Sequence, residues 1–392
     1  MSITPLEDLT ILEFTHTVMG PSCGMVLADL GADVIRVEPA PDGDRTRRLH
    51  GFATGFFVYF NRNKRCICID LKSAAGLKVA QDMARNADVL IENFGPGTMD
   101  RLGLGWDAVH DLNPRLVYLA MKGFLPGPSE HRPLLDELAQ YETGLAYMTG
   151  PPGQPLRAGA SVVDIMGGVM GVIGVLAALR QRDRDGIGRK VTSSLFESAA
   201  FLVAQHMAGE AATGVPTPPM PIRRRSWGIY ESFPTKNGEN LFIGITSDNH
   251  WHSFCATFEK PDLLADPRFT TNADRVNNNP ALRDNVAAIA RDHDIAQLQR
   301  LLDAANIPFA PVQTPSDLFD DPQLNAHGRM LPLLMPKGNV AKLPTTPICF
   351  NDEAPGLRRQ PPAAGEHTDE VLRALGYSAE QIAALRVGGA IS

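Results

Sequence analysis

Short apolar runs alternate with amphipathic stretches through the first part of the chain, and this alternation limits the possible folds more than any other feature. The patterns of strands stand at 9–14, 33–38, 66–71, 89–92 and 116–121, and those of helices at 23–30, 76–85 and 106–112. Strands that alternate with helices form a parallel sheet covered by helices on both faces. The pattern therefore predicts an α/β fold whose ligands bind beyond the carboxyl ends of the strands.

A segment rich in proline and small residues, 211–224, precedes a different pattern and is predicted to be a linker. Residues 227–245 alternate like two strands that turn at Asn237-Gly238, and helical stretches follow through Ala305, most continuously at 284–304. We therefore expect a small α+β domain at 225–315. From 330 onward the chain is proline-rich and loop-like, and it closes with a helix at about 368–375.

Charge and cysteine content bear on possible partners and on the compartment. With 37 Lys and Arg against 44 Asp and Glu, the formal net charge of −7 argues against a general nucleic-acid binder. The five cysteines form no C-x-x-C pair, as is usual in a reducing compartment. The apolar run 165–179 is shorter than the about 20 residues of a membrane span, and the N-terminus lacks signal-peptide features. We expect a cytoplasmic protein without a membrane or nucleic-acid partner.

Motifs for metals and nucleotide phosphates give no match. The sequence contains no HExxH and no GxxxxGK[ST]. Residues 103–108 match the dinucleotide fingerprint by letter only, because no strand directly precedes them. His250 and His252 are two residues apart, which is not the spacing of helical zinc ligands. We predict that the protein has no metal site.

Five segments taken together resemble a known family. They are FTHTVMGPSCGMVLADLGADVIRVE (14–38), NRNKRCICIDLKSAAG (61–76), VLIENFGPGTMDRLGLGW (89–106), GASVVDIMGGVMGVIGVLAALRQRDRDGIGRKV (159–191) and GEHTDEVL (365–372). In this order and spacing they are similar to class III CoA-transferases, the CaiB/BaiF family. The resemblance implies a Rossmann-like large domain built from both chain ends, 1–210 and part of 316–392, with a return linker after the small domain. It also implies an interlocked homodimer.

Asp164 matches the catalytic aspartate of that family. It follows the apolar run 161–163 and precedes a glycine-rich helix, so it also stands where a helix N-cap is expected. A carboxylate suits CoA transfer because it can act as nucleophile and leaving group in turn. The resemblance implies that CoA is a substrate and that no cofactor is bound permanently.

The resemblance also indicates which residues bind CoA. They are Ile69, Asp70, Leu71 and Lys72, then Asn93, Phe94 and Gly95, and then Arg101. Lys72 and Arg101 would face phosphate groups. Arg36, Arg45, Lys64 and Arg65 would add positive potential nearby. Pro39 replaces an arginine that contacts the nucleotide in formyl-CoA transferases, which leaves the adenosine contact open.

The acyl group is expected near His16, Thr17, Val18 and Met19, and near Asp136. Val18 replaces a glutamine of formyl-CoA transferases, which argues against formyl-CoA and oxalate as substrates. Leu135 replaces the histidine that moves the proton in α-methylacyl-CoA racemases, and leucine cannot move a proton. Both enzymes remain alternatives, as does a non-catalytic CoA-binding protein.

Residues 121–137 and 144–164 resemble transferases that act on C4–C5 dicarboxylates, such as mesaconyl-CoA enzymes. A substrate of this kind has a second carboxylate, which needs a cation because an unpaired buried charge is costly. The candidate side chains are Arg132 as first choice, Arg157, and Arg223 to Arg225.

Overall fold

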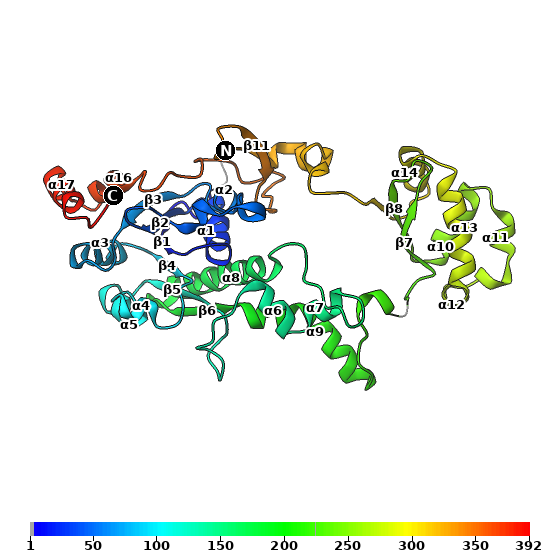
Figure 1. Cartoon of the computed structure of the whole chain (residues 1–392), viewed down its shortest axis with the longest axis horizontal. Coiled ribbons are helices and arrows are strands. Elements are labelled where there is room, and N and C mark those ends of the chain that lie inside the picture. Colours follow the sequence, from blue (N-terminus) through cyan, green and yellow to red (C-terminus); the bar gives the residue numbers. More distant parts are fainter. Residues whose placement is uncertain (1–3, 224) are drawn as a thin grey trace. The chain divides into compact units, whose positions relative to one another are not determined.

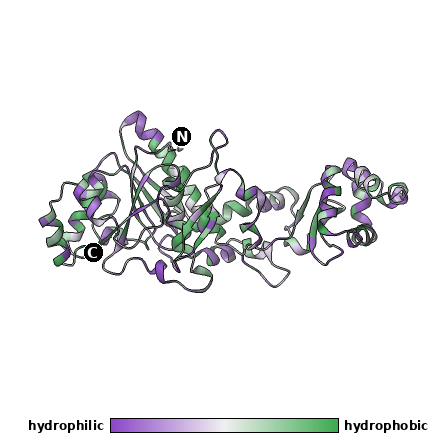
Figure 2. Ribbon diagram, turned by 90° about the horizontal axis from the view of Figure 1, so that it is seen from above, coloured by the Kyte–Doolittle hydropathy of each residue, from purple (hydrophilic) through white to green (hydrophobic). Residues whose placement is uncertain are grey.

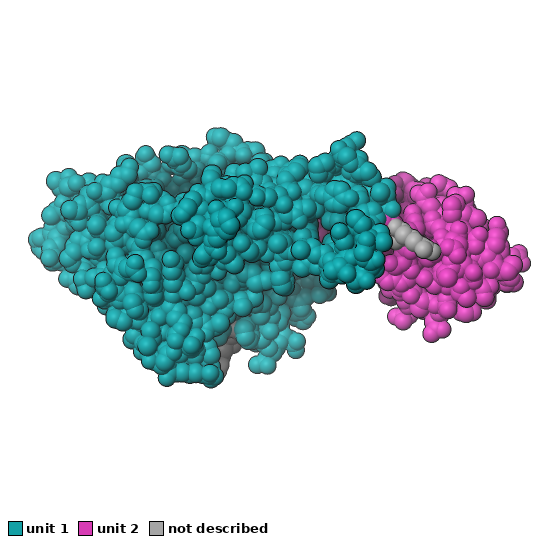
Figure 3. All heavy atoms as spheres, turned by 90° about the horizontal axis from the view of Figure 1, so that it is seen from below, with its two compact units in different colours: residues 1–222, 322–392 teal, residues 223–321 magenta. Residues whose placement is uncertain are grey.

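The structure is a computed structural model that describes residues 4–223 and 225–392 (Figure 1). The chain divides into two compact units (Figure 3). The larger comprises the residues up to Ile222 and those from Pro322 onward, and the smaller comprises Arg223–Asp321. The smaller unit thus ends beyond residue 315, where the sequence pattern had placed its boundary.

The larger unit is built on a six-stranded parallel sheet in the order β3-β2-β1-β4-β5-β6. Its strands are β1 (Thr10–Phe14), β2 (Asp33–Pro39), β3 (Arg65–Ile69), β4 (Val89–Glu92), β5 (Val117–Lys122) and β6 (Lys190–Ser194). The α/β prediction is confirmed, although the sequence analysis did not identify β6. Strand order reverses between β1 and β4, so the loops after these two strands diverge and leave a crevice between them.

Helices cover both faces of this sheet. One face carries α1 (Met19–Asp29), α8 (Val162–Asp185) and α9 (Leu195–Thr213), and the other carries α3 (Ala74–Arg85), α5 (Trp106–Leu112), α16 (Thr368–Ala374) and α17 (Ala379–Val387). Shorter helices are α2 (Phe56–Phe60), α4 (Thr98–Arg101), α6 (Asp136–Glu142), α7 (Leu145–Thr149) and α15 (Pro322–Asn325).

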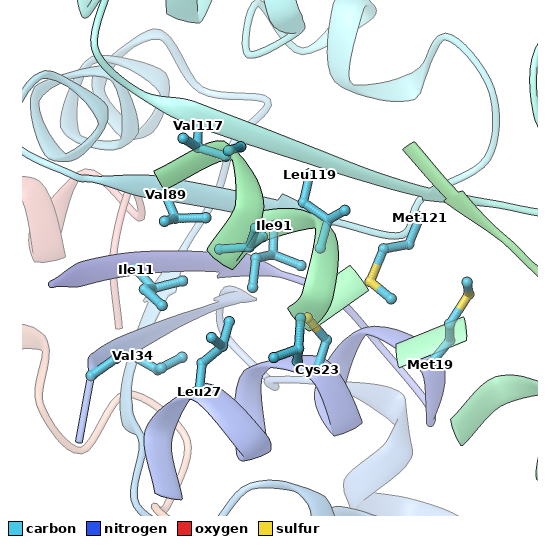
Figure 4. Close-up of a cluster of buried hydrophobic side chains, with 14 of the residues drawn as sticks. Ile11, Met19, Cys23, Leu27, Val34, Val89, Ile91, Val117, Leu119 and Met121 are labelled. Carbon is cyan, nitrogen blue, oxygen red and sulfur yellow. The ribbon is translucent and has the colours of Figure 1, made fainter. Parts of the chain in front are cut away.

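Neighbouring residues of a strand point to opposite faces, so each strand contributes to two cores. Ile11 belongs to the core beneath α1 and α8, and Leu12 to the core beneath α3 and α16. Figure 4 shows Cys23 and Leu27 of α1 beside strand residues of the first core. Figure 2 shows hydrophobic segments concentrated inside the larger unit. Strands buried on both faces explain the nearly continuous apolar runs in the sequence.

Helix α8 is the one described helix that is long and apolar enough, by length and composition, to cross a membrane. In the structure it packs against α1, α9, β5 and β6. A Cβ atom at Gly168 would lie 2.2 Å from Ser22 Oγ and 2.9 Å from the Met19 carbonyl oxygen. The glycine therefore lets α1 and α8 approach closely, as expected for a helix of the protein core.

The structure corrects the sequence prediction at three places. Helix α9 continues to Thr213, so residues 211–213 are helical and the linker begins at Gly214, whose φ of 69° ends the helix. Strands β10 (Met330–Leu334) and β11 (Val340–Pro344) form a hairpin where a loop was expected. Pro332 obscured this hairpin in the sequence, since proline in a strand is confined to an edge. The sequence analysis also missed α17.

The smaller unit combines a three-stranded antiparallel sheet with helices. Its strands are β7 (Ile229–Pro234), β8 (Asn240–Ile245) and β9 (Phe309–Pro311), and its helices are α10 (Asp248–Thr257), α11 (Pro261–Ala265), α12 (Asn272–Asn277), α13 (Asn279–Arg291) and α14 (Ile295–Ala304). The predicted hairpin at Asn237-Gly238 is confirmed. The predicted continuous helix 284–304 is two helices, because the Asp294 side chain accepts from the Gln297 N–H and starts a new one.

Candidate active site

A cavity of about 490 Å³ opens at the carboxyl end of the parallel sheet. Its walls come from the ends of β1, β2, β3 and β4 and include Thr15 to Thr17, Val37 to Pro39, Ile69 to Lys72, Phe94 and Thr98. It thus lies at the reversal of strand order, the usual ligand position in such sheets. Its volume falls within the range of small-molecule and cofactor sites.

The loops after β1 and β4 are joined across this reversal by Asn93. Its side-chain oxygen accepts from the His16 N–H at 2.9 Å, and its nitrogen donates to the His16 carbonyl at 3.0 Å. The rings of His16 and Phe94 stack with their centroids 5.9 Å apart. Asn93 therefore shapes one wall of the cavity by holding the backbone of His16 in place.

A buried ion pair between Glu92 and Lys122 supports the same wall, and the sequence analysis did not identify it. The Lys122 ammonium lies 2.7 Å from a Glu92 carboxylate oxygen and donates to the Phe94 carbonyl at 2.8 Å. Burial raises the pKa of Glu92 even though Lys122 opposes that shift. The pair fixes the loop that carries Asn93 and Phe94.

Several residues predicted to bind CoA line the cavity, and others lie beside it. The lining includes Ile69, Asp70, Leu71, Lys72 and Phe94 of the predicted CoA-binding residues, His16 and Thr17 of the predicted acyl site, and Pro39 and Arg45. Arg101 is exposed and donates to the Thr98 hydroxyl at 2.9 Å, next to the cavity wall. Gly95 is exposed in the loop after β4. The structure thus brings together most of the three predicted CoA-binding segments.

Three of the four basic residues expected to add positive potential are neutralised by acidic partners. Arg36 is fully buried and pairs with Glu13 at 2.6 Å, with Glu38 at 2.9 Å and with Asp44. Lys64 is also fully buried and pairs with Glu13 at 2.7 Å. Arg65 pairs with Asp33 and Glu370. Charges removed from water require such partners, so only Arg45 of the four lines the cavity.

One group in the described chain, Glu38 with Cys66 and Cys68, is compact enough to hold a metal ion. Arg36 and Arg47 both bind the Glu38 carboxylate, and Arg47 also donates to the Cys66 sulfur at 3.7 Å. Burial alone would raise the pKa of Glu38, yet the hydrogen bonds from Arg47 and the charge of Arg36 lower it to about 2. Two permanent positive charges already occupy the carboxylate, so it is not a suitable cation ligand.

Val18 and Met19, expected in the acyl site, point into the protein core. Their exposed fractions are 1% and 4%. Val18 packs with Met25 and Phe60, and Met19 lies against Gly167 of α8. Neither side chain lines the cavity. Leu135 is 68% exposed and Asp136 is buried, although the two are neighbours.

Asp164 lies in the first turn of α8, and Ser161 rather than Asp164 is the residue at the N-cap position. The cap is supplied from another helix. The Asp136 carboxylate accepts the N–H groups of Val163 at 2.8 Å and of Asp164 at 3.0 Å. It also accepts from the Gln140 amide at 2.7 Å. The expectation that Asp164 itself occupies the cap position is therefore wrong.

The environment of Asp164 changes its protonation. Burial, and secondly the charge of Asp136, raise the pKa of Asp164 to about 7. About half of the molecules would then carry an ionised Asp164 at neutral pH, whereas an ordinary aspartate is fully ionised. Strongly shifted carboxyl groups of this kind mark candidate catalytic residues.

The arginines proposed for a distal carboxylate have different surroundings. Arg132 is paired with Glu142 at 2.9 and 3.2 Å and lies over the Phe124 ring. Arg157 donates to the carbonyl of Ala158 at 2.9 Å and approaches Glu137 at 3.3 Å. The peptide that follows Arg157 is tied to the cap of α8, because the Ala158 N–H donates to Gln140 at 2.8 Å. Of the triplet, Arg224 lies outside the described residues, and Arg223 and Arg225 belong to the smaller unit.

Comparison with protein families gives one match that spans most of the chain. A family model described as CoA-transferase family III matches residues 6–368. An acyl-CoA transferase of Fusarium pseudograminearum is 33% identical over 98% of this chain and 88% of its own. A succinyl-CoA–D-citramalate CoA-transferase of Chloroflexus aurantiacus is 30% identical over 97% of both chains.

Relatives of similar identity are named for different acids. A formyl-CoA:oxalate CoA-transferase of Rhodopseudomonas palustris is also 30% identical, over 98% of this chain and 97% of its own. Among solved structures, a CAIB/BAIF family protein from Brucella suis superposes with a TM-score of 0.85 at 30% identity, covering 96% of this chain and 100% of that one. Overall similarity therefore identifies the class of reaction and leaves the acid pair open.

Proposed function

The chain belongs to CoA-transferase family III, and from this premise we propose that it moves CoA between a C4–C5 dicarboxylyl-CoA and a carboxylic acid, with Asp164 as the covalent nucleophile. The observation that carries the proposal is the half-buried carboxyl group of Asp164 in the first turn of α8, with its raised pKa. Its position in the sequence is that of the family's catalytic aspartate.

The proposed reaction uses the carboxylate in both directions. Asp164 attacks the thioester carbonyl, the C–S bond breaks, and an aspartyl–acyl anhydride and CoA thiolate result. The thiolate attacks the aspartyl carbonyl of the anhydride, which releases the first acid and leaves an aspartyl-CoA thioester. A second carboxylate repeats the two steps in reverse and leaves as its CoA ester. Atoms balance without a redox partner, and N–H donors must stabilise each oxyanion.

We propose the cavity at the strand ends as the CoA-binding site and Lys72 as a phosphate ligand. Lys72 is exposed at its wall. Lys72→Ala is expected to raise the KM for the acyl-CoA roughly 5- to 10-fold with little change in kcat, because one charge-assisted contact is lost. Lys78→Ala is the matched control, since Lys78 is an exposed lysine of α3 that pairs with Asp82. Equal effects of the two substitutions on KM would contradict the assignment.

Among the arginines, we favour Arg157 as the ligand of a distal carboxylate. Both oxygens of Glu142 already hold Arg132, whereas Arg157 makes one 3.3 Å contact with an exposed glutamate. Arg157 also precedes the residue that Gln140 links to the cap of α8. This preference replaces Arg132 as first choice.

A panel of CoA esters and acids tests the proposed substrate class. Succinyl- or mesaconyl-CoA should exchange CoA with dicarboxylates far faster than formyl-CoA does with oxalate. Arg157→Ala should raise the KM for dicarboxylates about tenfold and spare monocarboxylates, because only the former present a second charge. Arg132→Ala serves as the comparison. If formyl-CoA and oxalate are the best pair, or if Arg157→Ala affects both types of acid equally, the dicarboxylate proposal fails.

A racemase is the second candidate from another reaction class, and the fold alone would permit it. Leu135 at the position of the racemase base cannot take a proton, which is why we favour transfer. Solvent deuterium entering the α-carbon of an acyl-CoA, with no exchange of CoA between acids, would identify a racemase.

We also propose that the protein works as a homodimer. Ile165, Val169 and Ile173 recur every four residues on α8 and are exposed, with Phe201 and Met207 exposed on α9. Apolar stripes of this kind mark surfaces that another chain covers. Sedimentation that shows an active monomer at nanomolar concentration would contradict this proposal.

A further inference from the structure

We propose that Asp136 is a positioning residue, which caps helix α8 from outside and thereby holds its negative charge beside the carboxylate of Asp164. This inference rests on the proposed function, because it assigns the nucleophile to Asp164. It gives Asp136 a different role from the acyl contact that the sequence suggested.

The contacts of Asp136 define the role. The residue is buried, and its Oδ2 atom accepts two N–H groups of the first turn of α8, those of Val163 and Asp164, at 2.8 and 3.0 Å. Its Oδ1 atom accepts from Gln140 at 2.7 Å. All three contacts are donated to Asp136, which is the pattern of an ionised carboxylate. These donors occupy three of the roughly four lone-pair sites of the carboxylate, so little of it is left for a substrate.

Gln140 holds this arrangement in place. Its side chain is fully buried, and its amide is oriented because the nitrogen donates to Asp136 while the oxygen accepts from the Ala158 N–H. The chain Asp136–Gln140–Ala158 thus links α6 to the segment that enters α8. A fully connected buried network of this kind fixes geometry.

The cap alters the chemistry of Asp164 through the helix terminus. Free N–H groups at a helix N-terminus stabilise an anion and make a nearby carboxylate less basic. Asp136 takes two of these groups and places a negative charge beside them. Asp164 therefore remains a more basic carboxylate, and a more basic carboxylate is a better nucleophile towards a thioester.

Other ionisable side chains lie on the elements packed against α8. They include Cys23 and Asp29 on α1, Tyr118 and Lys122 on β5, Lys190 on β6, Glu197, His206 and Glu210 on α9, Asp136, Glu137, Tyr141 and Glu142 on α6, and Arg157 on the preceding loop. Among the described residues, Asp136 is the one whose charge acts on Asp164, and it acts together with burial. A change at Asp136 should therefore be visible in the titration of Asp164.

The test is the pH dependence of kcat/KM in wild type and in Asp136→Asn. Wild-type activity should fall about tenfold per pH unit below about 7, because protonated Asp164 cannot attack. Asparagine retains an oxygen that can cap the helix but removes the charge. Asp136→Asn should therefore move the acid limb down by about one pH unit, and lower kcat roughly tenfold at pH 8, with the KM for the acyl-CoA unchanged.

Two further variants separate positioning from other roles. Glu137→Gln removes the same charge from the adjacent, exposed residue of α6 and should leave the acid limb unchanged. Asp136→Glu keeps the charge, so the fall of kcat/KM at low pH should lie closer to its wild-type position than it does in Asp136→Asn. An unshifted limb with a raised KM in Asp136→Asn would make Asp136 an acyl contact and overturn the proposal. Equal shifts in Asp136→Asn and Glu137→Gln would also overturn it.

A readout without turnover distinguishes this inference from the proposed function. The carbon-13 resonance of the Asp164 carboxyl group reports its titration directly in the resting protein. A pKa of Asp164 that is lower in Asp136→Asn than in wild type supports the role of the Asp136 charge even if no acid pair supports transfer, in which case the proposed function fails alone. An unchanged pKa of Asp164 overturns the positioning role of Asp136 whatever the activity.

Discussion

Asp164→Ala is expected to lose CoA transfer by on the order of 10⁴-fold or more while it folds normally, as removal of a covalent nucleophile does. The substitution removes the group that forms both the anhydride and the thioester, so no bypass through water can transfer CoA. The Asp164 backbone N–H donates to the Asp136 carboxylate, and alanine retains this donor. Steady-state rates with the best acid pair, and circular dichroism of the purified variant, measure the two expectations.

Trapping provides independent evidence for the same residue. Hydroxylamine added during turnover should inactivate the wild type by forming a hydroxamate, and peptide mass spectrometry should locate it at Asp164. Glu137→Gln, which changes an exposed carboxyl group on α6, should be trapped as readily as wild type. If Asp164→Ala retains more than a few per cent of activity, or if the hydroxamate forms on another residue, Asp164 is not the nucleophile.

Arg36→Met is expected to destabilise the larger unit by about 3–5 kcal/mol, the typical effect of breaking a buried ion pair from one side. Arg36 is fully buried, and Glu13, Glu38 and Asp44 all contact its guanidinium. Methionine fills similar space but leaves three carboxylates with reduced compensation. Calorimetry, which can resolve the transitions of the two units, should show a lower Tm for the larger unit alone.

Arg189→Met is the matched control. Arg189 pairs with Asp185 on the surface, and exposed pairs contribute about 0–1 kcal/mol because water and ions screen them. Its Tm should stay within the error of the wild type. A comparable loss of stability in both variants would show that burial of the Arg36 network does not govern the effect.

The sequence by itself predicted the α/β class, five of the six strands of the parallel sheet and the neighbourhood of the cavity. These features are local. Apolar runs such as 89–92 belong to strands that are buried on both faces of the sheet. Segments that follow strands, such as Ile69 to Lys72, lie at the carboxyl end of the sheet because the strands are parallel. The catalytic candidate came from family resemblance, because a lone aspartate before a glycine-rich helix is equally typical of a cap.

Only the tertiary structure decided how the charged residues are used. The sequence suggested that Arg36 and Lys64 add positive potential near the CoA site, yet Glu13 on another strand pairs with both in the core. The cap of α8 comes from Asp136, 28 residues before Asp164. The sequence gives spacing along the chain, whereas electrostatic energy depends on distance and burial in space. The partner of a charge is therefore known only once the chain has folded.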